Sequence, residues 1–214
     1  MINIVKKYEV IASGSSGNAV LIDDVLVDVG LSFQKIKPYL SEVNYLIITH
    51  THSDHVNTKT LERIRKIYPR ITVIGNHEVA QLHDVDIIAN DLYKIELRDY
   101  TFIPIEVPHD VLTYAYTWET KRGSRVLYCT DTYDMSNITN GLPGYKYDYL
   151  FIESNHDEKK LEQIQGSSYK QYGYDAYSGA KRHLSTQQSK TFFYLNRKDK
   201  SSQHIELHKS SRFY

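Results

Sequence analysis

Three histidines and one aspartate lie within six consecutive positions of this chain, at His50, His52, Asp54 and His55. Divalent ions such as zinc accept neutral imidazole nitrogen and carboxylate oxygen as ligands, and one solvated histidine cannot hold such an ion alone. In an extended segment His50 and His52 point to the same side, and a following turn can direct Asp54 and His55 toward a second ion. The cluster predicts a metal site; a polar loop that happens to be histidine-rich is the competing interpretation.

Three further candidate ligands follow apolar runs that are typical of buried strands. They are His109, Asp131 and His208. Strand ends on one edge of a sheet are where a rigid scaffold can place ligands accurately. Alone, each has an ordinary explanation as a polar or turn residue. Together with the first cluster, they predict one composite site.

The elements that must position these side chains alternate between strand and helix. Strands are predicted at 5–12, 19–23, 25–29, 45–49, 71–74, 93–97, 101–107, 112–119, 125–130, 149–152 and 203–208. Helices are predicted from Ser32 toward Pro38, from Asn57 or Thr58 to Pro69, from Asn76 to Leu82, at 158–164, and after Ser185 with Gln188, Phe192 and Leu195 on one side. Two β-rich halves with helices predict the α/β class, as an αββα four-layer sandwich.

Length and charge narrow the class of protein. A chain of 214 residues can bury a sizeable core and is expected to form a single domain, 1–214. The formal net charge is zero, which argues against a protein that coats long nucleic acids. From Lys159 onward there are 11 Lys and Arg against 4 Asp and Glu, which leaves 15 against 22 before it. A polyanionic substrate would be drawn to the C-terminal side, unless this excess is only a solvated face.

Cysteine content and hydropathy bear on the compartment. Cys129 is the only cysteine, so an intrachain disulfide is excluded and a reducing compartment is favoured. No stretch approaches the roughly 18 apolar residues of a membrane span, and the N-terminus lacks the pattern of a cleavable leader. We therefore expect a cytoplasmic protein without a membrane partner.

The seven candidate ligands occur in the order of the ligands in the metallo-β-lactamase fold, and the chain resembles the YycJ (VicX) group of that superfamily. The match spans roughly residues 8 to 210 and rests on Ala12-Ser13-Gly14-Ser15-Ser16-Gly17-Asn18, Asp28-Val29-Gly30-Leu31-Ser32, His109-Asp110, Thr130-Asp131-Thr132, Glu153-Ser154-Asn155-His156-Asp157 and His183-Leu184-Ser185. The tail from Leu207 to Tyr214 is similar to the closing His-x-Ser-x-Arg-Tyr segment of ribonuclease Z.

The resemblance implies a role for each ligand. It implies one ion held by His50, His52 and His109, a second held by Asp54, His55 and His208, and Asp131 as the bridge between them. Zinc is the expected metal and Mn²⁺ or Fe²⁺ the alternative. Asp54 and His183 are the expected catalytic residues. His183 matches the histidine that ribonuclease Z uses near the leaving group, although a ligand or a helix-start residue remains an alternative.

The chain departs from the family pattern in two places, both of which affect access to the site. Arg182 stands where the family usually has glycine, and the segment 165–181 is a variable, tyrosine-rich loop. Its tyrosines could stack on bases, or the loop could be a surface segment or a homodimer contact. The turn at Ser13 to Asn18 could lend N–H groups to an anion or serve only as a hairpin connection. Ser15, Tyr172 and Arg182 are the candidate substrate-binding residues.

These residues predict a binuclear metal-dependent phosphodiesterase, a nuclease that hydrolyses DNA or RNA by a metal-bridged hydroxide. A hydrolase of small cyclic nucleotides, similar to phage enzymes that degrade immune signals, is the first alternative. A metal-stabilised binding protein without turnover is the second. The expected partner is therefore a nucleic acid or a nucleotide phosphodiester. The sequence leaves open DNA versus RNA, the polarity of cleavage, the native metal and the number of subunits.

Overall fold

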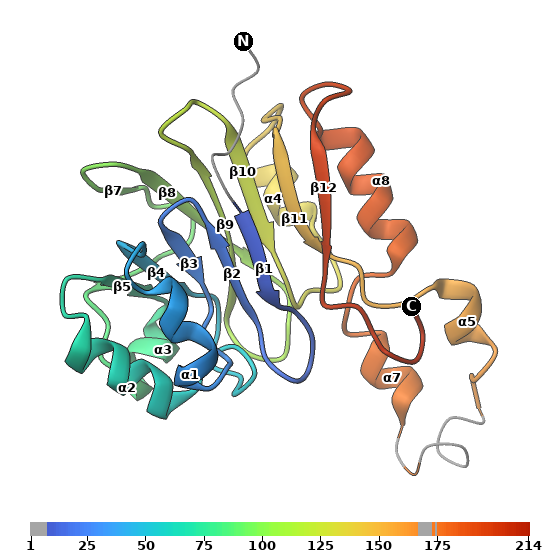
Figure 1. Cartoon of the computed structure of the whole chain (residues 1–214). Coiled ribbons are helices and arrows are strands. Elements are labelled where there is room, and N and C mark those ends of the chain that lie inside the picture. The colour runs from blue at the N-terminus through green and yellow to red at the C-terminus, as the bar shows by residue number, and fades with distance from the viewer. Residues whose placement is uncertain (1–7, 167–172, 174) are drawn as a thin grey trace.

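The computed structural model describes residues 8–166, 173 and 175–214. Two six-stranded sheets pack face to face, and helices cover their outer faces (Figure 1). The predicted αββα four-layer sandwich is therefore confirmed. Within the described residues, no helix is both long and apolar enough to cross a membrane.

The first sheet comes from the N-terminal half and has the strand order β1-β2-β3-β4-β5-β6. The first three strands are antiparallel and the pairs from β3 to β6 are parallel. Its strands are β1 (Tyr8–Ala12), β2 (Ala19–Ile22), β3 (Val25–Val27), β4 (Tyr45–Ile48), β5 (Thr72–Gly75) and β6 (Ile87–Ile88). Its helices are α1 (Phe33–Ile36), the 3₁₀ turn η1 (Lys37–Tyr39), α2 (Thr58–Ile67) and α3 (His77–Leu82).

The second sheet has the order β12-β11-β10-β9-β8-β7. Pairs from β7 to β10 are antiparallel, and β10, β11 and β12 are parallel. Its strands are β7 (Ile95–Glu96), β8 (Thr101–Val107), β9 (Thr113–Glu119), β10 (Arg125–Cys129), β11 (Tyr149–Glu153) and β12 (Gln203–Leu207). Its helices are α4 (Ser136–Gly141), α5 (Glu158–Glu162), α7 (Ala176–Ala180) and α8 (Thr186–Asn196). The sequence patterns missed α4, α7 and β6.

The main core lies between the two sheets and is unusually aromatic. Its largest fully buried side chains include Trp118, Tyr116, Tyr128, Phe102 and Phe151. Separate apolar layers join each sheet to its own helices. Successive side chains of a strand point to opposite faces of the sheet. Strands that are buried on both faces are therefore packed on both sides, and this packing makes the scaffold rigid.

Side-chain caps start several helices where the sequence predicts them. Asn57 accepts a hydrogen bond from the Thr60 N–H and Asn76 from the Val79 N–H, while Ser185 forms a capping box with Gln188. Of the three residues predicted on one side of α8, Phe192 is buried, whereas Gln188 and Leu195 are exposed. The buried residues of the helix are Ser189, Phe192, Phe193 and Asn196.

The strand directions bring distant parts of the chain to one edge of the sandwich. β3 and β4 end there in the first sheet, and β8, β10, β11 and β12 end there in the second. The predicted ligands follow four of these strands, so this edge carries the candidate site.

Candidate metal centre

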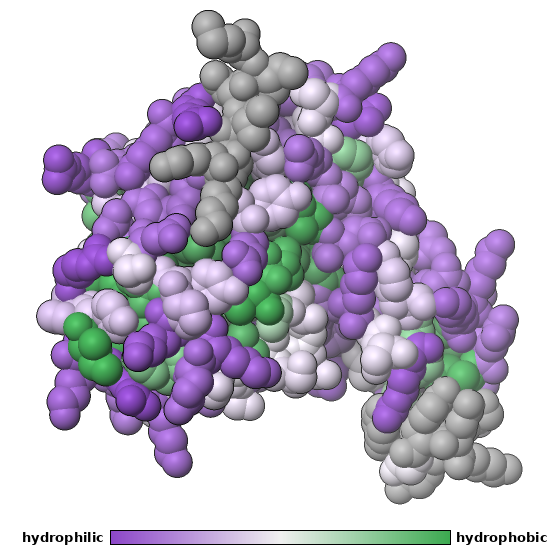
Figure 2. Space-filling model, in the orientation of Figure 1, coloured by the Kyte–Doolittle hydropathy of each residue, from purple (hydrophilic) through white to green (hydrophobic). Residues whose placement is uncertain are grey.

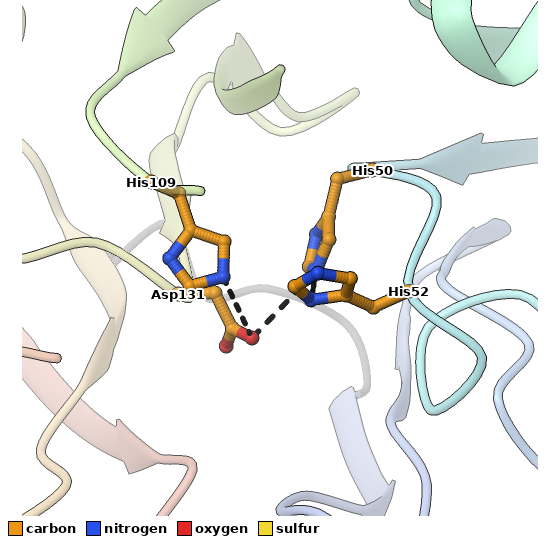
Figure 3. Close-up of side chains that lie close together, drawn as sticks. All are labelled: His50, His52, His109 and Asp131. Carbon is orange, nitrogen blue, oxygen red and sulfur yellow. Dashed lines mark hydrogen bonds and ion pairs between the residues drawn. The ribbon is translucent and has the colours of Figure 1, made fainter. Parts of the chain in front are cut away.

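The first group of donors gathers around Asp131, which follows β10. Figure 3 shows Asp131 between His109 on one side and His50 and His52 on the other. Nε2 of His50 lies 3.6 Å and Nε2 of His109 lies 3.9 Å from Oδ2 of Asp131. Nε2 of His50 is 3.1 Å from Nδ1 of His52. One donor atom from each of these four residues lies within 4.8 Å of all the others, close enough for one ion.

A second group meets the same carboxylate. It consists of Asp54, His55 and His208, whose donor atoms also lie within 4.8 Å of one another. Nε2 of His55 is 3.3 Å from Oδ2 of Asp131, and Nδ1 of His208 is 3.3 Å from Oδ1. Asp131 therefore stands between the two groups. The structure brings all seven predicted ligands together. In a third group, Glu153 and His183 join Asp131 and His208, again with donor atoms within 4.8 Å of one another, so the division of the ligands between two ions stays a prediction.

Two buried carboxylates behind the histidines were not among the predicted site residues. Oδ2 of Asp28 lies 2.7 Å from Nδ1 of His55, and Asp28 also accepts hydrogen bonds from the backbone and hydroxyl of Thr49. Oε1 of Glu153 lies 2.7 Å from Nδ1 of His208 and 2.6 Å from Nδ1 of His183. A carboxylate on the other ring nitrogen orients an imidazole for an ion. In the sequence, both residues stand at the ends of apolar runs and inside strings quoted for the resemblance, which is the signal that could have identified them.

The histidines of this site have nitrogen atoms left for a ligand. Nε2 of His208 and Nε2 of His109 are buried and form no hydrogen bond within the described residues. Leaving such atoms unpaired is costly, and a bound ion removes that cost. In the described geometry, Nδ2 of Asn18 lies 2.8 Å from Nε2 of His55, which ties the Ser13–Asn18 turn to the site. The donors thus fit divalent ions that accept nitrogen and oxygen ligands.

Three of the site residues have left-handed backbone conformations. Their φ values are 63° for Asp28, 51° for Asp131 and 52° for His208. A non-glycine residue rarely adopts positive φ, and such conformations persist only where the surrounding structure enforces them. These conformations turn the backbone directly after the strands, so that the three side chains point into the site.

The charges of the site depend on its burial and on its carboxylates. Burial, together with the neighbouring His55, holds the pKa of His50 well below its usual value, so its imidazole is neutral. Burial also opposes charge on His208, but Asp131 and Glu153 outweigh it and raise the pKa of His208 to about 9. Despite burial, His55 and His208 hold the pKa of Asp131 well below its usual range. Positive charge beside the buried Asp131 carboxylate therefore stabilises its ionised form.

The remaining predicted residues flank this centre. His183 contacts Glu153, and its side chain is 18% exposed. The Arg182 guanidinium is 2.8 Å from Asp110, whose other oxygen lies 3.0 Å from Nε2 of His109. Ser15 is exposed in the turn after β1. Tyr172 lies outside the described residues, as do 167–172 and 174 of the predicted 165–181 loop, whose later part forms α7.

No family model matches the sequence. The chain is 30% identical over 185 residues to the exodeoxyribonuclease WalJ of Streptococcus pneumoniae, an alignment that covers 76% of this chain and 66% of that protein. It is 27% identical over 174 residues to the exodeoxyribonuclease YycJ of Bacillus anthracis, covering 72% and 64%. The chain thus spans slightly less than two thirds of the length of these relatives.

Solved structures share the whole fold. The short form of human tRNase Z has a TM-score of 0.68 at 14% identity, covering 96% of this chain and 93% of that one. The metallo-β-lactamase fold protein YhfI of Bacillus subtilis has a TM-score of 0.67 at 17% identity, covering 95% and 86%. These likenesses establish the architecture. The chain therefore has the metallo-β-lactamase fold, and its sequence is similar to that of the WalJ and YycJ proteins.

Proposed function

We propose that the protein is a binuclear metal-dependent phosphodiesterase that acts as a nuclease on DNA. The observation that carries this proposal is that histidines of two donor groups lie against the single carboxylate of Asp131. A structural zinc site needs four closed donors and no shared carboxylate, so this arrangement favours catalysis. The relatives named exodeoxyribonucleases support DNA as the substrate.

In this proposal each group holds one divalent ion, with zinc expected and Mn²⁺ as the alternative. His50, His52 and His109 would hold one ion and Asp54, His55 and His208 the other, with Asp131 lying between the two groups as the candidate shared ligand. Bound divalent ions supply Lewis acidity toward a phosphate and a nucleophile at neutral pH.

Two residues of the chain are placed to handle protons. Asp54 is partly exposed, with Oδ2 lying 3.7 Å from Nε2 of His55, so it can accept a proton at the open side of the centre. Nδ1 of His183 is held by Glu153, which leaves Nε2 to face the leaving oxygen of a bound phosphodiester and donate to it. The carboxylate fixes the orientation of the ring before substrate arrives.

The test compares the wild-type protein with His52→Ala and Asp131→Ala on bis(p-nitrophenyl) phosphate and on single- and double-stranded DNA. Both variants are expected to lose at least about 100-fold in rate, since each removes a ligand of the centre. His83→Ala, at the C-terminal cap of α3, is the matched control and should retain activity. Equal rates in the wild type and both ligand variants would contradict the proposal.

Metal content and a substrate panel complete the test. Close to two equivalents of metal per chain are expected, and a single equivalent would favour a structural site. The panel adds RNA and cyclic nucleotides, each with Zn²⁺ or Mn²⁺. A nuclease that grips several phosphates should lose affinity steeply as salt rises, whereas a cyclic-nucleotide hydrolase should respond weakly.

A further inference from the structure

A pocket opens directly beside the candidate metal centre. It lies between the Ser13–Ser16 turn, the end of α7 and the segment from His208 to Phe213, and both His183 and His208 line it. Figure 2 shows the surface hollowed between the turn that joins β1 to β2 and the region around α7. A phosphodiester placed on the metal centre would therefore extend on one side into this pocket.

The lining of this pocket suits an anion. Arg182, Lys209 and Arg212 contribute positive charge, and hydroxyl groups come from Ser13, Ser15, Ser16, Ser210 and Ser211. None of its lining residues, all in the described part of the chain, is an aspartate or glutamate. Glu206 and Asp110 outside the pocket contact Lys209 and Arg182. Such a concentration of cations stands out in a chain with a net charge of zero.

The inner wall of the pocket is apolar and its size is limited. Ala176, Ala180 and Phe213 line it and belong to a small buried cluster with Leu161 and Ile164. The volume is about 640 Å³, within the roughly 300–1,000 Å³ of small-molecule sites. Apolar surface beside cations and hydroxyls matches a nucleoside that carries a phosphate, and the volume suits the end of a strand rather than a long stretch of it.

We infer that this pocket binds the terminal nucleotide of the DNA strand and recognises its terminal phosphomonoester. The inference rests on the proposed function and deepens it. The terminal phosphate contacts Arg212, Lys209 and the serine hydroxyls, while the adjoining phosphodiester lies on the metal centre. Charge-assisted hydrogen bonds from arginine to phosphate are among the strongest that proteins make. The enzyme then cleaves at a fixed distance from a strand end.

The test is calorimetric binding to the purified, metal-loaded protein, because a phosphomonoester offers no bond for a phosphodiesterase to cleave. The probes are deoxyadenosine 5′-monophosphate, deoxyadenosine 3′-monophosphate and deoxyadenosine. At least one monophosphate is expected to bind about ten-fold or more tightly than the nucleoside. The preferred isomer identifies the strand end that the pocket accepts. Equal affinities for all three probes would overturn the inference.

Two variants separate the pocket from the metal centre as the phosphate site. Arg212→Gln removes a cation from the pocket, and Gly179→Leu adds bulk where an added Cβ would meet no atom within 4 Å. Both should bring the monophosphate affinity down to that of the nucleoside. The matched control is Arg122→Gln, an exposed change of the same charge in the turn before β10, and it should bind as the wild type does. Tight monophosphate binding that survives both variants would place the phosphate on the metals and overturn the inference.

The same experiments distinguish this inference from the proposed function. Calorimetry needs no turnover. If the protein prefers monophosphates but cleaves no phosphodiester, the inferred pocket stands and the proposed activity is contradicted. If the protein cleaves DNA but does not distinguish monophosphates from the nucleoside, the proposed activity stands and the inferred pocket is contradicted.

Discussion

At the scale of single residues, the site depends on buried carboxylates that face imidazoles rather than solvent. Asp28 and Glu153 are fully buried, and each contacts ring nitrogens of the histidines that point toward the candidate ions. An uncompensated buried carboxylate is unfavourable, so these residues are expected to act through the histidines that they orient. Glu153 contacts both His208 and His183, which couples a candidate ligand to the candidate proton donor.

Glu153→Gln should weaken metal binding by about 10- to 100-fold, the usual effect of losing a carboxylate behind a ligating histidine. The amide can still form a hydrogen bond, but it cannot stabilise positive charge on His208 or His183. Titration with Zn²⁺ against a competing chelator measures the effect. Glu119→Gln, exposed at the end of β9, serves as the control. An unchanged zinc affinity in Glu153→Gln would rule out this role.

At the scale of elements, the site requires two loops to pass each other closely. The Asn18 N–H donates to the carbonyl of Asp54, the Val29 N–H donates to that of His55, and the Gly30 N–H donates to that of Asn18. A Cβ built on Gly30 would lie 1.7 Å from the carbonyl oxygen of Asp54. Only glycine permits this approach, so the loop after β3 fixes the position of the second half of the histidine cluster.

Gly30→Ala should therefore destabilise the fold by about 2–4 kcal/mol and displace Asp54 and His55. The change is measured by urea unfolding and by metal content, which should fall below that of the wild type. Gly179→Ala is the matched control, because the same methyl group meets open space inside α7 and improves helix propensity. Equal stability of the two alanine variants would contradict the close approach.

Local patterns explain what the sequence could predict at this scale. The caps at Asn57, Asn76 and Ser185 involve residues three positions apart, so they are visible in the chain itself. The buried face of α8 is not visible in the chain itself, because Ser189 and Asn196 are polar residues whose burial depends on distant partners. Ser189 contacts His204, and the carbonyl of Asn196 accepts from the Tyr147 N–H.

The residues of the candidate site also fall into two kinds: those that a local pattern in the sequence identifies and those whose roles depend on the folded structure. The donors at 50–55 form a local string, and Asp131 and His208 follow apolar strands, so type and spacing identified them. The roles of Asp28 and Glu153 depend on which strands are neighbours and on left-handed backbone turns, which no local pattern specifies. The pocket beside His208 likewise requires the first turn of the chain to lie against its last residues.

At the scale of the whole molecule, the two sheets are also joined at the end away from the site. Asp24, in the turn between β2 and β3, accepts hydrogen bonds from Tyr100 in the β7–β8 turn, from Asn44 and from Lys121 in the β9–β10 turn. Its side chain is only 13% exposed. These contacts hold the sandwich closed at the edge opposite the metal centre, independently of any ion.

The contacts of Asp24 predict that the free energy of unfolding decreases in acid. Burial alone would raise the pKa of Asp24, but the hydrogen bonds from Tyr100, Asn44 and Lys121 prevail and lower it. A pKa lower in the folded than in the unfolded state contributes stability above the unfolded value, near 3.9, and that contribution disappears as pH falls through the folded value.

Asp24→Asn should cost about 1–2 kcal/mol at pH 7 and make the stability less dependent on pH below about 4. Urea unfolding of the wild type, Asp24→Asn and the exposed control Asp84→Asn, between pH 3 and pH 7, measures this. If the wild type and Asp24→Asn lose stability in parallel as the pH falls, Asp24 does not hold the two sheets together through its charge.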